Sequence, residues 1–191
     1  MNSYILTALL ISSATSTAPV HQRTSTNNTP VEKVISVEDI KIVQETKKVE
    51  VVVKTMEQFL TKIGHQESSN NYRAVNQFGY MGRYQFGKST LKSLGINVTK
   101  EQYLSNSSLQ ERSMVLLLKA NKHTLRNYIS KHVGETINNI YITESGILAA
   151  AHLAGAGNVI KFFKNGKEFR DGNGTKMTKY LNKFKGYNLN L

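Results

Sequence analysis

The chain has 191 residues, enough for one domain with a hydrophobic core or for a smaller domain with a tail. It contains no cysteine, which excludes disulfide bonds, thiolate metal sites and thiol nucleophiles. The formal net charge is +12, and from residue 56 onward nineteen Lys or Arg stand against eight Asp or Glu, a balance of +11. This excess in the predicted folded part indicates an anionic partner.

The first eighteen residues resemble a secretory signal peptide. An apolar run from Tyr4 to Ile11 is too short to cross a bilayer, so no stable membrane span is expected there, and small residues follow it up to Ala18. No Lys or Arg precedes the run, so an N-terminal tail that is not a signal is the alternative. We expect residues 19–54, which hold both prolines, to be a linker or a weakly ordered extension, and residues 55–191 to form the folded domain.

Helical signals begin at Thr55. Thr55 and Gln58 fit a capping box, after which Met56 and Ile63 lie on one helical face. Glu67 continues that face, where the next buried apolar residue would be expected. A carboxylate in this position indicates a functional group held at the edge of the core.

The rest of the chain also favours helices. A second capping box, Ser108 with Glu111, is predicted to open the longest helix, which ends before Gly134 and should be the central core helix. Further helices are expected at 144–154, 158–164 and 176–184. The predicted fold class is therefore mainly α.

The window from residue 65 to residue 91 holds the strongest functional signal. Its one carboxylate belongs to Glu67, which Ser68 follows directly. After a polar bridge comes the sequence Gly-Tyr-Met-Gly-Arg-Tyr-Gln-Phe at residues 79–86, a glycine-rich and aromatic-rich loop. Such a loop could fold back over the carboxyl group and form the wall of a sugar cleft, which predicts glycan chemistry with a single acid.

This window resembles the catalytic region of bacterial lysozyme-like proteins of the lytic transglycosylase and resuscitation-promoting-factor type. In those families a Glu-Ser pair precedes a Gly-Leu-Met-Gln or Gly-Gly-Leu-Gln-Phe element, and the later segment 151–155, Ala-His-Leu-Ala-Gly, resembles their Ala-Tyr-Asn-x-Gly helix. The resemblance covers about residues 56–187. Two departures are that residues 82–84 separate Met81 from Gln85, and that His152 stands where Tyr is commoner.

The resemblance implies a lysozyme-like single domain with an N-terminal extension, acting on peptidoglycan without a cofactor. Glu67 would protonate the bond between N-acetylmuramic acid and N-acetylglucosamine, and would then deprotonate the muramoyl C6 hydroxyl to close a 1,6-anhydro ring. The residues implied in orienting Glu67 or contacting the sugar are Ser68, Tyr80, Met81, Tyr84, Gln85 and His152. The protein would be a monomer that is secreted, periplasmic or attached to the cell envelope, or part of a phage virion.

Each of these assignments has a structural alternative. His152 could be a core histidine, Tyr80 and Tyr84 core aromatic residues, and Gln85 a loop-stabilising amide. Glu144 is more simply an acid at a helix N-terminus than a second catalytic carboxylate.

No metal site is predicted. The histidines at 65, 123 and 132 lack a ligand spacing. The segment 171–175, Asp-Gly-Asn-Gly-Thr, lacks the glutamate that a calcium loop requires, because Asn182 stands in its place, and it is expected to be a turn.

Three other functions compete with the transglycosylase hypothesis. A hydrolytic muramidase on the same scaffold would add water instead of closing a ring. A non-catalytic wall-binding or virion structural protein would have kept the fold without turnover. A nucleic-acid binder is the least favoured, because no zinc, helix-turn-helix or RNP motif accompanies the scattered lysines. The sequence does not distinguish bacterial from phage origin, or cleavage inside glycan strands from cleavage at their ends.

Overall fold

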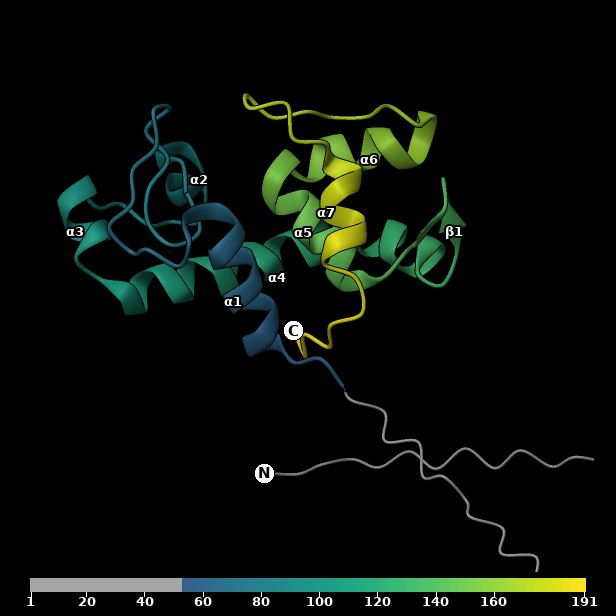
Figure 1. Ribbon diagram of the computed structural model, residues 1–191, viewed down its shortest axis with the longest axis horizontal. Helices are drawn as coiled ribbons and strands as arrows, with labels where there is room; N and C mark the ends of the chain where they lie inside the picture. The colour runs from purple at the N-terminus through teal and green to yellow at the C-terminus, as the bar shows by residue number, and fades with distance from the viewer. Residues whose placement is uncertain (1–52) are drawn as a thin grey trace, which may run out of the picture. The chain divides into compact units, whose positions relative to one another are not determined.

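A computed structural model describes residues 53–191, and this part of the chain is mainly helical, as predicted. The signal-peptide prediction and all but the last two residues of the linker prediction lie outside the described residues. The described elements are α1 (Met56–Ser68), α2 (Lys88–Ser93), α3 (Lys100–Leu104), α4 (Ser107–His132), β1 (Thr136–Ile137), β2 (Ile140–Tyr141), α5 (Glu144–Ala154), α6 (Ala156–Asn165) and α7 (Met177–Lys183) (Figure 1).

The start of α1 confirms the predicted capping box. The Thr55 side chain accepts a hydrogen bond from the Gln58 N–H, and the Gln58 side chain accepts one from the Thr55 N–H. Two of the N–H groups that a helix start leaves without partners are satisfied in this way. The helix buries Phe59 and Ile63 completely and ends where Ser69 adopts a left-handed conformation. Glu67 therefore lies in the last turn, one turn beyond Ile63.

The loop between α1 and α2 is held by isolated bridges rather than by a sheet. Met81 pairs with both Val75 and Phe86, which folds the glycine-rich segment into two tight turns. The short helices α2 and α3 follow, and the sequence pattern predicted neither. α3 has its own capping box, formed by Thr99 and Gln102.

The predicted capping box at the start of α4 is wrong. The N-cap residue is Asn106, whose side chain accepts from the Leu109 N–H, and Ser108 is already inside the helix. The Glu111 side chain does not bond to the backbone at the helix start, because its carboxylate binds side chains of the preceding loop. It accepts hydrogen bonds from the hydroxyls of Tyr72 and Tyr84, at 2.7 and 2.6 Å.

Arg83 completes this network between the loop and α4. Its Nη1 atom lies 2.8 Å from Glu111 Oε1, and its Nε atom donates to the Asn70 side chain at 2.9 Å. Gln110, fully buried in α4, accepts from the Arg83 backbone N–H and donates to the carbonyl groups of Tyr72 and Tyr103. Side chains of α4 thus replace the sheet hydrogen bonds that the loop lacks.

The helix at the centre of the packing is α5 rather than the longer α4. Residues 145–151 are all buried, and α5 packs against α4, α6 and α7. Its predicted bounds, residues 144–154, are confirmed, with Thr143 as the N-cap residue and Gly155 after its end. Small residues make this close packing feasible, since a Cβ atom added at Gly146 would lie only 2.5 Å from the Leu181 carbonyl oxygen.

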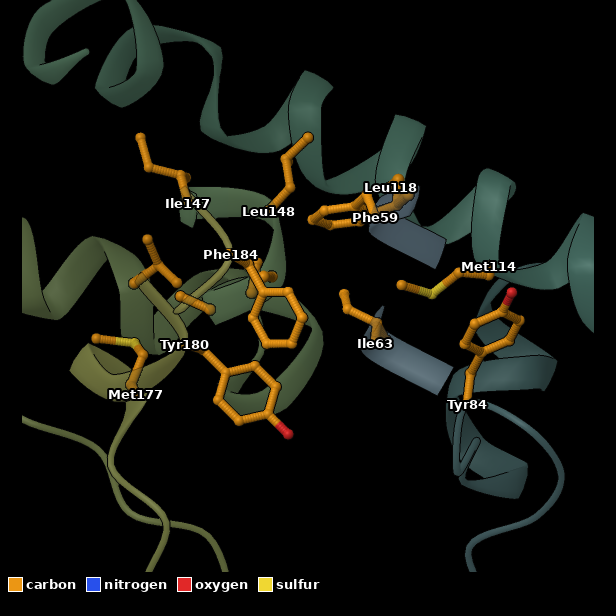
Figure 2. Packing of buried hydrophobic residues seen from close by; sticks show 14 of the residues in the cluster. Phe59, Ile63, Tyr84, Met114, Leu118, Ile147, Leu148, Met177, Tyr180 and Phe184 are labelled. Atoms are coloured by element: carbon orange, nitrogen blue, oxygen red, sulfur yellow. The ribbon is translucent and has the colours of Figure 1, made fainter. Parts of the chain in front are cut away.

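A single hydrophobic core joins these helices. Figure 2 shows Ile63 of α1 between Tyr180 and Phe184 on one side and Met114 of α4 on the other. The predicted helices at 158–164 and 176–184 are observed as α6 and α7, and α6 ends at Gly166 with φ of 72°. Within residues 53–191 no single helix is long and apolar enough to cross a membrane, although α5 and α6 would pass such a test together, with a bend of 117° between them.

Replacing Glu111 by Gln should lower the free energy of unfolding by about 2–3 kcal/mol, because Arg83 would keep its charge and lose its partner. A fully buried pair would lose more, but the Glu111 side chain is 31% exposed. Urea denaturation followed by circular dichroism measures the change.

Glu144→Gln is the matched control. The Glu144 side chain is similarly exposed, at 30%, but it forms one ion pair, with Lys122 at 3.0 Å. Its loss should cost about 1 kcal/mol or less. Equal losses for the two variants would contradict the importance of the Glu111 network.

Candidate active site around Glu67

Glu67 is a largely buried carboxylate held by a distant tyrosine. Its side chain is 15% exposed, and its Oε1 atom accepts a hydrogen bond of 2.6 Å from the Tyr180 hydroxyl. Tyr180 lies on α7, 113 residues further along the chain, and only 3% of it is exposed. Tyr180 bonds to Oε1, and the other carboxyl oxygen, Oε2, has no hydrogen-bond partner within residues 53–191.

His152 is the second group beside Glu67. It lies in the last turn of α5, where its Nε2 atom is 3.7 Å from Glu67 Oε1 and its side chain is 7% exposed. Its Nδ1 atom is buried and has no hydrogen-bond partner within residues 53–191. Burial lowers the pKa of His152 below the ordinary value, and the opposing attraction of the Glu67 charge is weaker. The imidazole is therefore neutral near neutral pH.

Tyr180 remains a hydrogen-bond donor over the whole physiological pH range. Burial raises its pKa most, and the negative charge and hydrogen bond of Glu67 raise it further. The charge of Asp171 adds to the same shift, so a second carboxylate lies within electrostatic reach of the Tyr180 hydroxyl.

Asp171 is fixed in a turn, as predicted for residues 171–175. Its Oδ1 atom accepts hydrogen bonds from the N–H groups of Asn173 and Thr175, at 3.0 and 2.7 Å. The turn follows α6 and precedes α7, and a Cβ atom added at Gly172 would lie 3.3 Å from Cζ of Phe78. The loop before α2 and the loop before α7 therefore approach each other through Phe78 and Gly172 at the same end of the helices (Figure 1).

Three of the predicted site residues form the framework of the glycine-rich loop. The Ser68 hydroxyl donates to the Arg83 carbonyl oxygen at 2.8 Å, so Ser68 ties the end of α1 to the loop. Tyr84 is fully buried and donates to Glu111, and Met81 is 6% exposed. The Tyr84 ring is therefore a core aromatic, which was the structural alternative for this residue.

The other two loop residues are more accessible. Tyr80 is 45% exposed. Gln85 has a left-handed backbone with φ of 50°, and its Nε2 atom donates to the Gly82 carbonyl oxygen at 2.9 Å, so its amide stabilises the turn. Among the predicted site residues, His152 is the one whose side chain makes a polar contact with the Glu67 carboxylate within residues 53–191.

Glu144 and the observed cavities do not include Glu67 among their contacts. Glu144 is at the opposite end of α5 from His152 and pairs with Lys122. Within residues 53–191 no group of three His, Asp or Glu converges in a way that could hold a metal ion. Glu67 lines neither of two cavities, of about 500 and 720 Å³, in the described part of the chain; the larger one includes His65 and Asn70, which flank Glu67 in the chain.

Comparison of the chain with protein-family models, with curated proteins and with solved structures gives no match.

Sequence reasoning did not identify Tyr180. Tyr180 in α7 and Phe184, the residue that ends the helix, are four residues apart on an apolar face. This pattern predicts core packing. The core assignment is correct for both rings, but the Tyr180 hydroxyl points away from the Phe184 ring (Figure 2) and donates to Glu67. No local pattern distinguishes such a tyrosine from a purely structural one.

The burial of His152 predicts a pH dependence of stability. In the unfolded chain a histidine binds its proton at a pH of about 6.5, whereas the folded protein binds it only at lower pH. The free energy that the neutral, buried His152 contributes to folding is fully present above a pH of about 6.5 and is lost as the pH falls below that value. The loss of unfolding free energy between about pH 7.5 and pH 5.5 should therefore be smaller in His152→Asn than in the natural protein.

Urea denaturation at the two pH values provides this comparison. An equal pH dependence in both proteins would contradict burial of a neutral imidazole at position 152.

Proposed function

We propose that this protein is a lysozyme-like peptidoglycan lytic transglycosylase that cleaves the β-1,4 bond between N-acetylmuramic acid and N-acetylglucosamine. The observation that carries the proposal is the Glu67 carboxyl group, 15% exposed, held on one oxygen by Tyr180 and placed beside a histidine that burial keeps neutral. A fixed and partly desolvated carboxyl group is suited to act as an acid and then as a base.

The proposed reaction uses Glu67 twice. Its Oε2 atom first gives a proton to the glycosidic oxygen while the bond from that oxygen to the muramoyl C1 breaks. The resulting carboxylate then takes the proton of the C6 hydroxyl of the same sugar, and O6 bonds to C1 to close the 1,6-anhydro ring. The substrate supplies the attacking group, so no carboxylate nucleophile and no water are needed.

The neighbours of Glu67 affect the two steps differently. A protonated histidine at position 152 would favour the charged carboxylate and would weaken Glu67 as an acid, whereas the neutral imidazole does not have this effect. The Tyr180 hydroxyl donates to Oε1, so it opposes the first proton transfer and stabilises the carboxylate that performs the second. Of the other predicted contacts to the sugar, those from Tyr80, which is 45% exposed, and from the Tyr84 backbone belong to the same proposal, whereas Ser68, Met81 and Gln85 support the loop.

The charge of the protein supports the proposed partner. Among residues 161–185 of the described chain, none of the seven lysines forms an ion pair with a carboxylate, which leaves a positive surface for an anionic wall polymer. A secreted, envelope-associated or virion-borne location follows from this substrate.

A hydrolytic muramidase is the second candidate, and Asp171 is the observation that favours it. One oxygen of Asp171 is fixed by two backbone N–H groups, and the residue lies within electrostatic reach of Tyr180. A carboxylate held in this way could position the attacking water that hydrolysis requires. Anhydro products from digested sacculi support the transglycosylase, and reducing-end products support the hydrolase.

Glu67→Gln should lower the rate of sacculus digestion by about 10²–10⁴-fold, because the amide can neither give nor take the proton. Separation of the released muropeptides by mass measures the rate and the product type. Glu144→Gln, the same change at a helix terminus away from the site, should keep the natural rate.

Unchanged digestion by Glu67→Gln would overturn the proposal. A natural protein that binds sacculi without turnover would indicate the wall-binding or structural alternative. Binding to DNA that weakens steeply with salt, without binding to sacculi, would indicate the nucleic-acid alternative.

Tyr180→Phe should lower turnover by about 10–100-fold with little change in sacculus binding, because it removes the hydrogen bond that holds Glu67 and keeps the buried ring. Tyr128→Phe is the control, since no hydrogen bond of the Tyr128 hydroxyl is present in residues 53–191. Equal rates for the two variants would show that Tyr180 does not position Glu67.

A further inference from the structure

The larger cavity, of about 720 Å³, lies where the outward face of α1 meets the segment that follows α7. From α1 it is lined by residues 57, 58, 61, 62 and 65, which share one helical face, and Lys183 and Tyr187 line it from the C-terminal segment. Its volume is in the range of sites that bind small molecules or short peptides. We name it the α1 pocket.

Two lysines in the α1 pocket are fixed in place without a carboxylate partner. Lys62 Nζ donates to the Lys183 carbonyl oxygen at 2.9 Å and lies 5.5 Å from the centre of the Tyr187 ring. Lys183 Nζ donates to the Gln66 side-chain oxygen. Neither lysine forms an ion pair within residues 53–191. Both ammonium groups are therefore oriented by neutral groups, and their charges remain available to an anion.

One acid, Glu57, also lines the α1 pocket, and it too forms no ion pair within the described part of the chain. A pocket with two lysines and one carboxylate suits a ligand that carries several carboxylates and one ammonium group. The peptide stem of peptidoglycan has this chemistry, because it contains acidic residues and a diamino acid.

Glu67 lies on the face of α1 that carries Ile63, away from the α1 pocket, so a ligand that reaches both must pass round the end of the helix. Gln66, which accepts from Lys183, is the residue before Glu67 at that end, and His65 lines the pocket. The stem is attached to the muramic acid, the sugar whose bond Glu67 would cleave. From Glu57 to His65 the helix rises about 12 Å, and an extended tetrapeptide spans about 13–14 Å.

We infer that the α1 pocket binds the peptide stem of the peptidoglycan strand, with Lys62 and Lys183 on its carboxylates and Glu57 on its ammonium group. This inference rests on the proposed function for the choice of ligand. It makes the α1 pocket a determinant of which wall fragments the protein retains, separate from the bond-breaking group at Glu67.

Isothermal titration calorimetry with a free stem tetrapeptide that contains a diamino acid tests this inference directly. The full chain should bind the peptide, and Lys62→Met or Lys183→Gln should weaken binding about tenfold each, whereas Lys179→Gln, an exposed lysine of α7 outside the pocket, should not. Lys62→Met keeps the aliphatic packing on Tyr187, and Lys183→Gln is an independent change if the first variant unfolds.

Glu57→Gln distinguishes the proposed pairing from general attraction of anions. It should weaken peptide binding if Glu57 pairs with the ammonium group, and an increase in affinity would overturn that assignment. Absence of peptide binding to the natural protein, or equal weakening by Lys179→Gln, would overturn the inference as a whole.

A second measurement separates this inference from the proposed reaction. In the inactive Glu67→Gln protein, Lys62→Met should weaken binding to sacculi but not to glycan strands from which an amidase has removed the stems. Equal weakening for both polymers would contradict stem recognition. Peptide binding does not depend on glycan cleavage, so it can hold even if the transglycosylase reaction fails its own test.

Discussion

The ion pair between Arg83 and Glu111, 2.8 Å long, is the interaction on which the arrangement around Glu67 depends. The loop between α1 and α2 has almost no regular secondary structure, so its polar groups need partners elsewhere. Glu111 and Gln110 supply them from α4. The Arg83 carbonyl in turn accepts the Ser68 hydroxyl, next to Glu67. Helix α4, the loop and the end of α1 that carries Glu67 are thereby joined through Arg83.

This network explains why the capping box predicted for α1 is correct and the one predicted for α4 is wrong. Thr55 with Gln58 forms a capping box because nothing else competes for those side chains. Ser108 with Glu111 has the same pattern, but tyrosine and arginine groups from the loop bind the Glu111 carboxylate more strongly than a helix N–H does. The short helices α2 and α3 were missed because five or six residues give too little periodicity to recognise.

The surroundings of Glu67 show the same division between local and long-range information. The helical phase of α1 placed Glu67 at the edge of an apolar face, and the structure places it there, one turn beyond Ile63. The spacing of apolar residues in α1 gives no information on Tyr180, which lies 113 residues further along the chain, in α7. The sequence left Tyr80 and Tyr84 open between sugar contacts and core aromatic residues, and the structure buries Tyr84 in the core and leaves Tyr80 exposed. Composition identifies such a loop, but packing decides which of its rings are accessible.

The central claim is that Glu67 closes a ring within the substrate and does not direct water to it. Digestion of purified sacculi in water enriched in oxygen-18 tests this claim most directly, because hydrolysis places a water oxygen on the new reducing end and ring closure does not. The proposed mechanism predicts released anhydro-muropeptides without the heavy isotope. Released muropeptides that carry one oxygen-18 atom at the muramoyl C1 would contradict it and would establish the hydrolytic alternative.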